Sequence, residues 1–257
     1  MTSINSLSKQ RIVVAVDGGI HGTKKGMTGG VGMIAFHLAS VSSNCSVVKS
    51  ISVLGRFFPP NPKDPITNNK MELMGFAIMA SNLVNELDDG ASVDRDRRSI
   101  NIEFWSDSTY ALGILFHPKW IPKKNKTLVA NAKRELDDLV TMAIVSGNFV
   151  RGHKGHFINE FADLVAATSI QRQKNIQHKL SFNAVEVSCL FCDNFPCQIT
   201  DNVLGRVPIK NWKDRFEAMR STSYESPCAQ RKAYDAEFTI TRPPDNNAEN
   251  ENAGGAG

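Results

Sequence analysis

The sequence lacks long apolar runs and is poor in cysteine. No stretch approaches the roughly 20 consecutive apolar residues that a membrane-spanning helix needs, so we expect no membrane association. Its beginning, MTSINSLSKQR, lacks the apolar segment of a secretory signal. The five cysteines follow no regular spacing, which favours a reducing compartment over a disulfide scaffold. These absences predict an intracellular protein of the cytoplasm, nucleoid or nucleus that is not secreted.

Acidic residues are absent from one internal segment, between Ser108 and Arg134. The basic residues that fall in this segment are Lys119, Lys123, Lys124, Lys126, Lys133 and Arg134. The formal net charge of +4 does not by itself argue for a nucleic-acid partner. The segment is either a solvated loop and helix start or, if it lies beside an active site, a surface that binds phosphates.

The hydrophobic periodicity predicts strands first and then alternating helices and strands. Strands are expected at residues 11–16, 31–40, 47–57, 99–105 and 148–153. Helices are expected at residues 71–87, 106–116, 126–144 and 159–173. The order, which we write βββαβαβα, is typical of an α/β fold with a five-stranded mixed sheet and flanking helices.

The chain divides into four parts on composition and periodicity. Residues 1–10 are an N-terminal tail, and residues 11–179 hold the predicted α/β domain. Residues 180–240 have little periodicity and are a small cysteine-bearing accessory region. Residues 241–257 are polar and of low complexity, so we expect a disordered tail.

The cysteines of the accessory region leave two interpretations open. Cys189 and Cys192 form a C-x2-C pair, and Cys197 and Cys228 follow it. Four thiolates match the ligand count of a structural Zn²⁺ site, although a convincing zinc ribbon has two such pairs. The alternative is a packed appendage with free cysteines. In either case the region is a candidate for binding nucleic acid, a partner protein or the main domain.

Four acidic residues are expected to meet at one edge of the predicted sheet. Asp17 and Asp107 each end a predicted strand, and if these strands are adjacent and parallel both carboxylates emerge at the same edge. Glu72 and Asp163 lie near the starts of predicted helices. Each residue alone has a structural alternative as a turn former, helix cap or dipole partner. Their joint placement favours a functional site.

Such a group of carboxylates repels itself unless a cation neutralises it. Oxygen ligands without cysteine select a hard ion, Mg²⁺ or Mn²⁺, rather than zinc. Two Mg²⁺ ions about 3.5–4 Å apart form a known clamp for in-line phosphodiester hydrolysis, in which one ion activates water and the other stabilises the departing 3′ oxygen. The pattern therefore predicts a metal-dependent nuclease.

Four motifs in residues 11–173 resemble the type 1 ribonuclease H family. They are VDGGI followed by TGGVGMIAF, TNNKMELMGF, WSDSTYALG and GHKGHFINEFADLVA, in the family's order and with compatible spacing. The resemblance implies a ribonuclease H-like catalytic domain with Asp17, Glu72, Asp107 and Asp163 as metal ligands. It also implies that His153 is the catalytic histidine that assists proton movement or product release. Mg²⁺ is the implied metal, as two ions, with Mn²⁺ as a substitute.

The same resemblance suggests which residues bind the substrate. Asn68 and Asn69 would contact the minor groove of a hybrid, where the 2′-hydroxyl distinguishes RNA from DNA. Gly18 and Gly19 would allow the RNA backbone to approach closely. Lys123 and Lys124 belong to a basic loop that is shorter than the basic insertion of many bacterial members, and would bind phosphates. The asparagines alternatively serve as helix-capping and turn residues.

The leading hypothesis is a monomeric endonuclease that cuts the RNA strand of RNA–DNA hybrids and leaves 5′-phosphate and 3′-hydroxyl ends. A resolvase, integrase or exonuclease of the same superfamily is less compatible with the GHKGH segment and the asparagine pair. The alternative of another class is a non-catalytic module that binds nucleic acid or protein. Degenerate copies usually lose an acid, and here all four are present.

Overall fold

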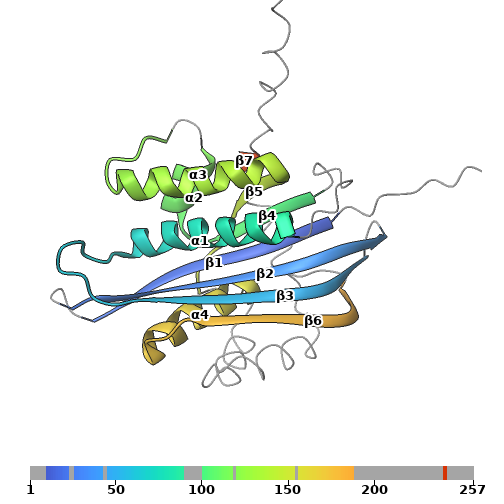
Figure 1. Ribbon diagram of the computed structural model, residues 1–257, viewed down its shortest axis with the longest axis horizontal. Coiled ribbons are helices and arrows are strands. Elements are labelled where there is room, and N and C mark those ends of the chain that lie inside the picture. Colours follow the sequence, from blue (N-terminus) through green and yellow to red (C-terminus); the bar gives the residue numbers. More distant parts are fainter. Residues whose placement is uncertain are drawn as a thin grey trace, which may run out of the picture.

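The computed structural model describes residues 10–22, 26–42, 45–89, 100–117, 120–153, 156–187 and 240–241. These residues form a seven-stranded sheet in the order β6-β3-β2-β1-β4-β5-β7, seen from the side in Figure 1. The strands are β1 (Gln10–His21), β2 (Thr28–Ser42), β3 (Cys45–Phe58), β4 (Ile100–Ser106), β5 (Ile144–Phe149), β6 (Ile176–Val187) and β7 (Ile240–Thr241).

The sheet is mixed, and β1 is its central strand. β1, β2 and β3 form an antiparallel meander, whereas β4 pairs with β1, and β5 with β4, in parallel. β6 and β7 extend the two sides of the sheet by antiparallel pairing with β3 and β5. The parallel pair β1–β4 brings the carboxyl ends of both strands to the same edge.

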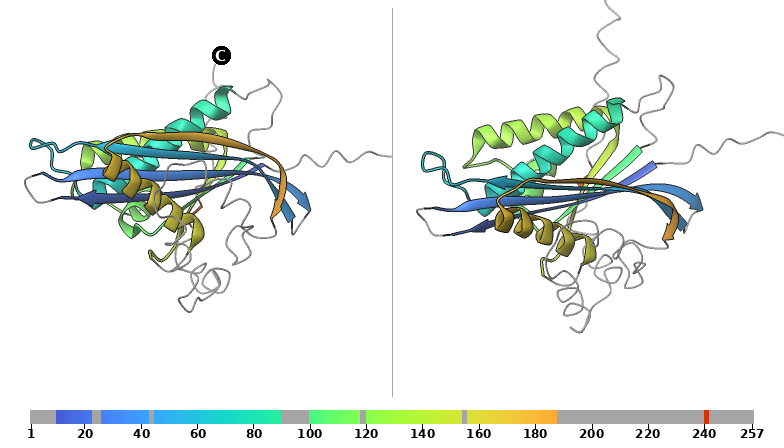
Figure 2. Two further views of the ribbon diagram at one scale, coloured as in Figure 1. Left: turned by 90° about the horizontal axis from the view of Figure 1, so that it is seen from below. Right: turned by 60° about the horizontal axis from the view of Figure 1, so that its bottom comes forward.

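Helices cover both faces of this sheet. α1 (Asn68–Asp89), α2 (Thr109–Phe116) and α3 (Lys126–Met142) lie on one face, and α4 (Phe157–Arg172) lies on the other (Figures 1 and 2). β1 is therefore buried on both sides, which explains its continuous apolar run. Val14 and Val16 belong to the core beneath α1, and Val13 and Ala15 belong to the core against α4.

The predicted fold class is confirmed, with three differences in detail. The connection between β4 and β5 holds two helices, α2 and α3, as the periodicity predicts, although the order βββαβαβα wrote this connection as a single helix. β5 begins at Ile144, where a helix was expected to end. The sheet also continues into β6, so the predicted boundary after Lys179 falls inside a strand.

β6 was missed because the first half of the strand has few buried side chains among its described ones. Ile176 and Leu180 are buried against the α4 face, whereas Gln177 and Lys179 between them are exposed. This alternation is typical of a strand with one buried face at the side of a sheet. The cysteines of the expected zinc site and almost all of the expected disordered tail lie outside the described residues, so both stay predictions. Within the described residues, no helix is both long enough and apolar enough to span a membrane.

Candidate active site at the carboxyl ends of β1 and β4

The four predicted acids come from four elements that meet at one edge of the sheet. Asp17 lies in β1 and Asp107 directly follows β4, its parallel neighbour. Glu72 is the fifth residue of α1, and Asp163 is the seventh residue of α4. The two strands and the two helices on opposite faces therefore deliver carboxylates to the same place.

The carboxylates lie close together. One oxygen of each of Asp17, Glu72 and Asp107 lies within 4.8 Å of the others. Asp163 forms a second such group with Glu160 and His153. The two groups are adjacent. Asp163 is close enough for its charge to raise the pKa of both Asp17 and Asp107. The structure thus brings all four predicted acids together.

Burial and mutual repulsion both disfavour the ionised acids. Burial raises the pKa of Asp17 well above its ordinary value, and repulsion from Asp107 and Asp163 raises it further. Burial also raises the pKa of Glu72, with additional repulsion from Asp17 and Asp107. The pKa of Asp107 is raised by burial, although hydrogen bonds and the nearby His153 oppose this shift. The cluster therefore needs positive charge to be stable in its ionised form.

The donor set fits a hard divalent cation. Glu72 is 7% exposed, and its Oε2 atom is buried without a hydrogen-bond partner among the described residues. A buried carboxylate oxygen without a donor is costly, and a cation among three carboxylates would satisfy it. Oxygen ligands from Asp17, Glu72 and Asp107 suit Mg²⁺ or Mn²⁺.

The two histidines of the GHKGH segment have different surroundings. His153 is 75% exposed, and its Nδ1 atom lies 4.0 Å from Oε2 of Glu160. His156 caps α4, is 4% exposed and stacks on Trp105 with ring centroids 5.8 Å apart. Burial lowers the pKa of His156 to about 4, so this ring is neutral at physiological pH. Of these two histidines, His153 is the one that solvent can reach.

A protein-family comparison supplies the family of this chain. The ribonuclease H family model matches residues 9–171, a span that contains all four acids and both histidines. The chain belongs to the ribonuclease H family. No curated protein is significantly similar to it in sequence.

Solved ribonuclease H structures resemble the chain at low sequence identity. LC9-RNase H1, described as a type 1 RNase H with the type 2 active-site motif, is 19% identical with a TM-score of 0.47, covering 69% of this chain and 80% of that chain. RNase H1 of Halobacterium salinarum is 18% identical with a TM-score of 0.38, covering 64% and 99%. LC11-RNase H1 in complex with an RNA/DNA hybrid is 16% identical with a TM-score of 0.43, covering 63% and 98%.

Two residues of this ribonuclease H site had no role in the sequence-based prediction. Asn159 donates a side-chain hydrogen bond to Asp107, and Glu160 lies beside His153 and Asp163. Both side chains are buried, at 2% and 7% exposure. The signal that could have found them is the Asn-Glu pair that stands before Asp163 in the GHKGH motif.

The glycines and asparagines expected to bind substrate lie beside the acids. A Cβ atom at Gly18 would lie 2.7 Å from the backbone nitrogen of Glu72, so this glycine lets α1 pack directly on β1. A Cβ atom at Gly19 would make only an ordinary contact at 3.7 Å. Asn68 and Asn69 are exposed at the start of α1 and line a hollow of about 400 Å³. The close-approach argument therefore applies to Gly19, whereas Gly18 has a packing role.

Lys123 and Lys124 are exposed in the loop that precedes α3. This loop belongs to the connection between β4 and β5, on the α1 face of the sheet, and not to the elements that carry the acids. Asn125 and Lys126, which directly follow the loop, line a hollow together with Met71 of α1, the residue before Glu72. Binding to a phosphate at a distance from the cleaved bond stays a prediction.

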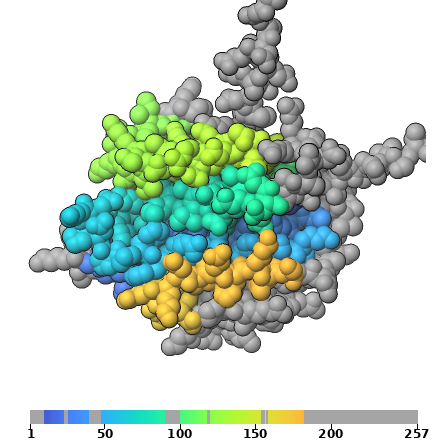
Figure 3. All heavy atoms as spheres, in the orientation of Figure 1, coloured from blue at the N-terminus to red at the C-terminus, as the bar shows by residue number. Residues whose placement is uncertain are grey.

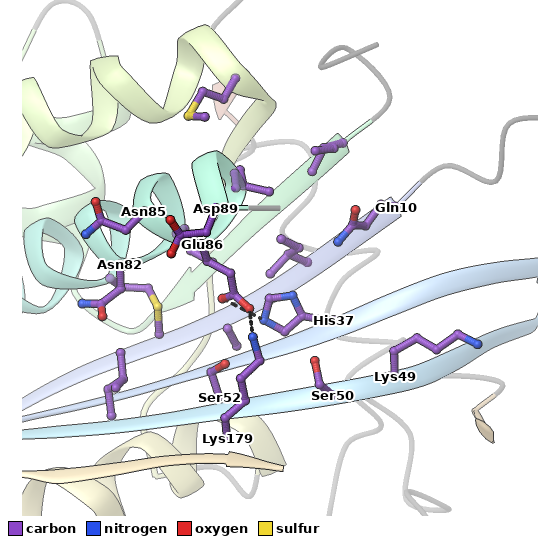
Figure 4. A pocket seen from close by; sticks show the side chains of 18 of the residues that line it. Gln10, His37, Lys49, Ser50, Ser52, Asn82, Asn85, Glu86, Asp89 and Lys179 are labelled. Atoms are coloured by element: carbon purple, nitrogen blue, oxygen red, sulfur yellow. Dashed lines mark hydrogen bonds and ion pairs between the residues drawn. The ribbon is translucent and has the colours of Figure 1, made fainter. Parts of the chain in front are cut away.

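A second polar cluster lies at the other end of α1. It lines a cavity of about 740 Å³ between α1, β2, β3 and β6 (Figure 4). Glu86 of α1 forms an ion pair with Lys179 of β6, and its Oε2 atom lies 3.6 Å from Nε2 of His37 in β2. In the space-filling view, α1 and β6 lie on the same face of the molecule, with α3 above α1 (Figure 3). The cluster therefore ties β6, which the family match does not include, to the helix that carries Glu72.

Proposed function

We propose that this chain is a Mg²⁺-dependent endonuclease that hydrolyses the RNA strand of RNA–DNA hybrids and leaves 5′-phosphate and 3′-hydroxyl ends. The observation that carries the proposal is the gathering of four carboxylates, with an unsatisfied buried oxygen on Glu72, at one edge of the sheet. Membership of the ribonuclease H family supports the hybrid as substrate. A nuclease with this acid cluster needs metal, because the ionised cluster is otherwise unstable.

The residues that would hold the metal are Asp17, Glu72, Asp107 and Asp163. Bound there, a pair of Mg²⁺ ions, or Mn²⁺ in their place, would supply an activated water and a stabilised 3′ leaving oxygen. Asp17 and Glu72 are buried, whereas Asp107 and Asp163 are half-buried and so lie on the side of the site that substrate would approach. The zinc site in the accessory region is a separate prediction that this mechanism does not use.

The remaining residues have roles that their positions support. His153, exposed beside Asp107 and Glu160, would accept or donate a proton at the edge of the cluster. Asn68 and Asn69 would read the 2′-hydroxyl in the minor groove from the start of α1, and Gly19 would let the RNA backbone approach. Lys123 and Lys124 would bind phosphates of the hybrid.

A cleavage assay tests the proposal. Purified protein is incubated with a labelled RNA–DNA hybrid, double-stranded RNA or double-stranded DNA, with Mg²⁺ or with excess chelator. We expect cleavage of the RNA strand of the hybrid in Mg²⁺ alone. Asp17→Asn should abolish it, whereas Asp88→Asn, which alters an exposed acid at the far end of α1, should not. Hybrid binding without cleavage would contradict the proposal and favour a non-catalytic binding module.

A further inference from the structure

Asn159 lies in the first turn of α4, which follows the GHKGH segment. His156 is the N-cap of this helix, so Asn159 is its third residue. Its side chain is 2% exposed and donates a hydrogen bond to the carboxylate of Asp107. Asn159 therefore links the helix that carries Asp163 to the strand end that carries Asp107.

Packing restricts the carboxylate of Asp107 less than it restricts those of Asp17 and Glu72, so a hydrogen bond has more effect on Asp107. Asp17 and Glu72 are each 7% exposed, so packing restricts their side-chain conformations. Asp107 is only half-buried, so packing on its exposed side restricts its carboxylate less. A hydrogen bond from a buried amide removes the remaining rotational freedom and fixes the direction of the carboxylate oxygens.

Among the described residues, the other polar atom of Asn159 has no hydrogen-bond partner. The amide nitrogen donates to Asp107, and within the described residues the carbonyl oxygen Oδ1 is buried without a hydrogen bond. A buried carbonyl oxygen is normally satisfied, because leaving it without a donor is unfavourable. Next to a site for a hydrated cation, the donor that fits this oxygen is a water molecule bound to the metal.

We propose that Asn159 is a positioning residue of the metal site, which orients Asp107 through its amide nitrogen and accepts a hydrogen bond from metal-bound water at Oδ1. This inference rests on the proposed metal-dependent function and adds a residue to it. Asn159 would not contact the substrate or the ion directly. Its loss should therefore weaken metal binding rather than hybrid binding.

The test compares three variants with the wild-type protein. Asn159→Ala removes both polar atoms of the side chain. Asn159→Leu removes them as well but keeps the side-chain volume, so it serves as the test if the cavity in Asn159→Ala unfolds the protein. Ser169→Ala is the matched control, because Ser169 is a fully buried polar residue of the same helix whose hydroxyl donates to the carbonyl of Val165 in that helix. Calorimetric titration with Mg²⁺ alone measures metal binding, and kinetics on the hybrid give kcat and KM.

Both Asn159 variants should raise the dissociation constant for Mg²⁺ by roughly 10–100-fold, as loss of an outer-sphere partner does. The kcat should recover in part at high Mg²⁺, with KM for the hybrid changed by no more than about twofold. If the wild-type protein cuts the hybrid and a folded Asn159 variant binds Mg²⁺ equally tightly, this inference is wrong but the proposed function stands. No Mg²⁺ binding and no cleavage by either the wild-type protein or Ser169→Ala would overturn the proposed function and this inference together.

Discussion

Gly152 lies directly against Asp107. A Cβ atom at position 152 would overlap Oδ2 of Asp107 and would lie 3.1 Å from its Cγ atom. The backbone before His153 therefore rests on the carboxylate that ends β4. A side chain at this position could be accommodated only if the carboxylate of Asp107 or the segment that carries His153 moved.

Gly152→Ala should reduce hybrid cleavage by about tenfold or more, because the methyl group must displace Asp107 or the segment that carries His153. The loss of stability should be modest, about 1–3 kcal/mol, since the overlap is local and at the surface of the site. Gly26→Ala is the control, because a Cβ atom there has no neighbour within 4 Å. Steady-state kinetics and urea unfolding measure the two effects. Full activity in Gly152→Ala would show that this contact does not matter.

Asp17→Asn should separate catalysis from stability. The pKa of Asp17 is raised by burial and by repulsion from Asp107 and Asp163, so its ionised form destabilises the metal-free fold. The sign follows from linkage: for a carboxyl with a raised pKa, stability falls as pH rises through that pKa. At neutral pH without metal, the variant should be more stable than the wild-type protein by on the order of 1–3 kcal/mol.

The same variant should lose at least about 100-fold in activity, more than an outer-sphere partner contributes. Mg²⁺ should raise the melting temperature of the wild-type protein, because binding to the folded state stabilises it, and should have less effect on the variant. Thermal unfolding with Mg²⁺ and with chelator measures this difference. A variant that is less stable than wild type in chelator would contradict the repulsion argument.

The parts of the fold that follow from local patterns could be predicted from the sequence. The apolar run of β1 predicts a strand buried on both faces, and the regular spacing of α3 predicts its buried stripe. The meeting of Asp17 and Asp107 follows from the rule that adjacent parallel strands end at one edge. β6 could not be predicted with the same ease, since residues 176–181 alternate between buried and more exposed side chains and form no apolar run.

The finer parts of the site depend on packing that no local pattern encodes. The role of Gly18 is visible only once α1 lies on β1, because its missing side chain leaves space for the backbone of Glu72. The hydrogen bond from Asn159 to Asp107 joins residues that are distant in sequence and requires particular side-chain conformations. The pairing of Glu86 with Lys179 likewise depends on β6 lying beside β3.

The basic loop before α3 should contribute to affinity through phosphates. Replacing both Lys123 and Lys124 by Ala should raise KM for the hybrid several-fold, leave kcat nearly unchanged and reduce the slope of log K against log salt by about 2. Lys174→Ala is the control, since this exposed lysine follows the far end of α4. Binding measured at several salt concentrations gives the slope. An unchanged slope in the double variant would remove these lysines from the interface.

Glu86 should control the protonation of His37. Burial lowers the pKa of His37, attraction to Glu86 partly restores it, and Lys179 lowers it. In Glu86→Gln the pKa of His37 should fall further, which NMR titration of the ring protons measures. The loss of stability should be about 1 kcal/mol or less, because Glu86 and Lys179 are partly exposed. Asp89→Asn, an exposed acid one turn away, should leave His37 unchanged; a rise in the pKa of His37 in Glu86→Gln would refute the pairing.

His156 should make the protein less stable in mild acid. Burial lowers its pKa to about 4 from an ordinary 6.5, so between these values the unfolded chain takes up a proton that the folded protein excludes. The unfolding free energy should fall as pH drops through this range, by about 3 kcal/mol in total, and level off below it. The raised pKa values of Asp17 and Glu72 act in the opposite direction, so the contribution of His156 is the difference between wild type and His156→Gln. Urea unfolding from pH 7 to 4 measures the unfolding free energy of both proteins. The advantage of the wild-type protein over His156→Gln should shrink as the pH falls. The control His21→Gln, at an exposed position on β1, should differ from wild type by the same amount at every pH.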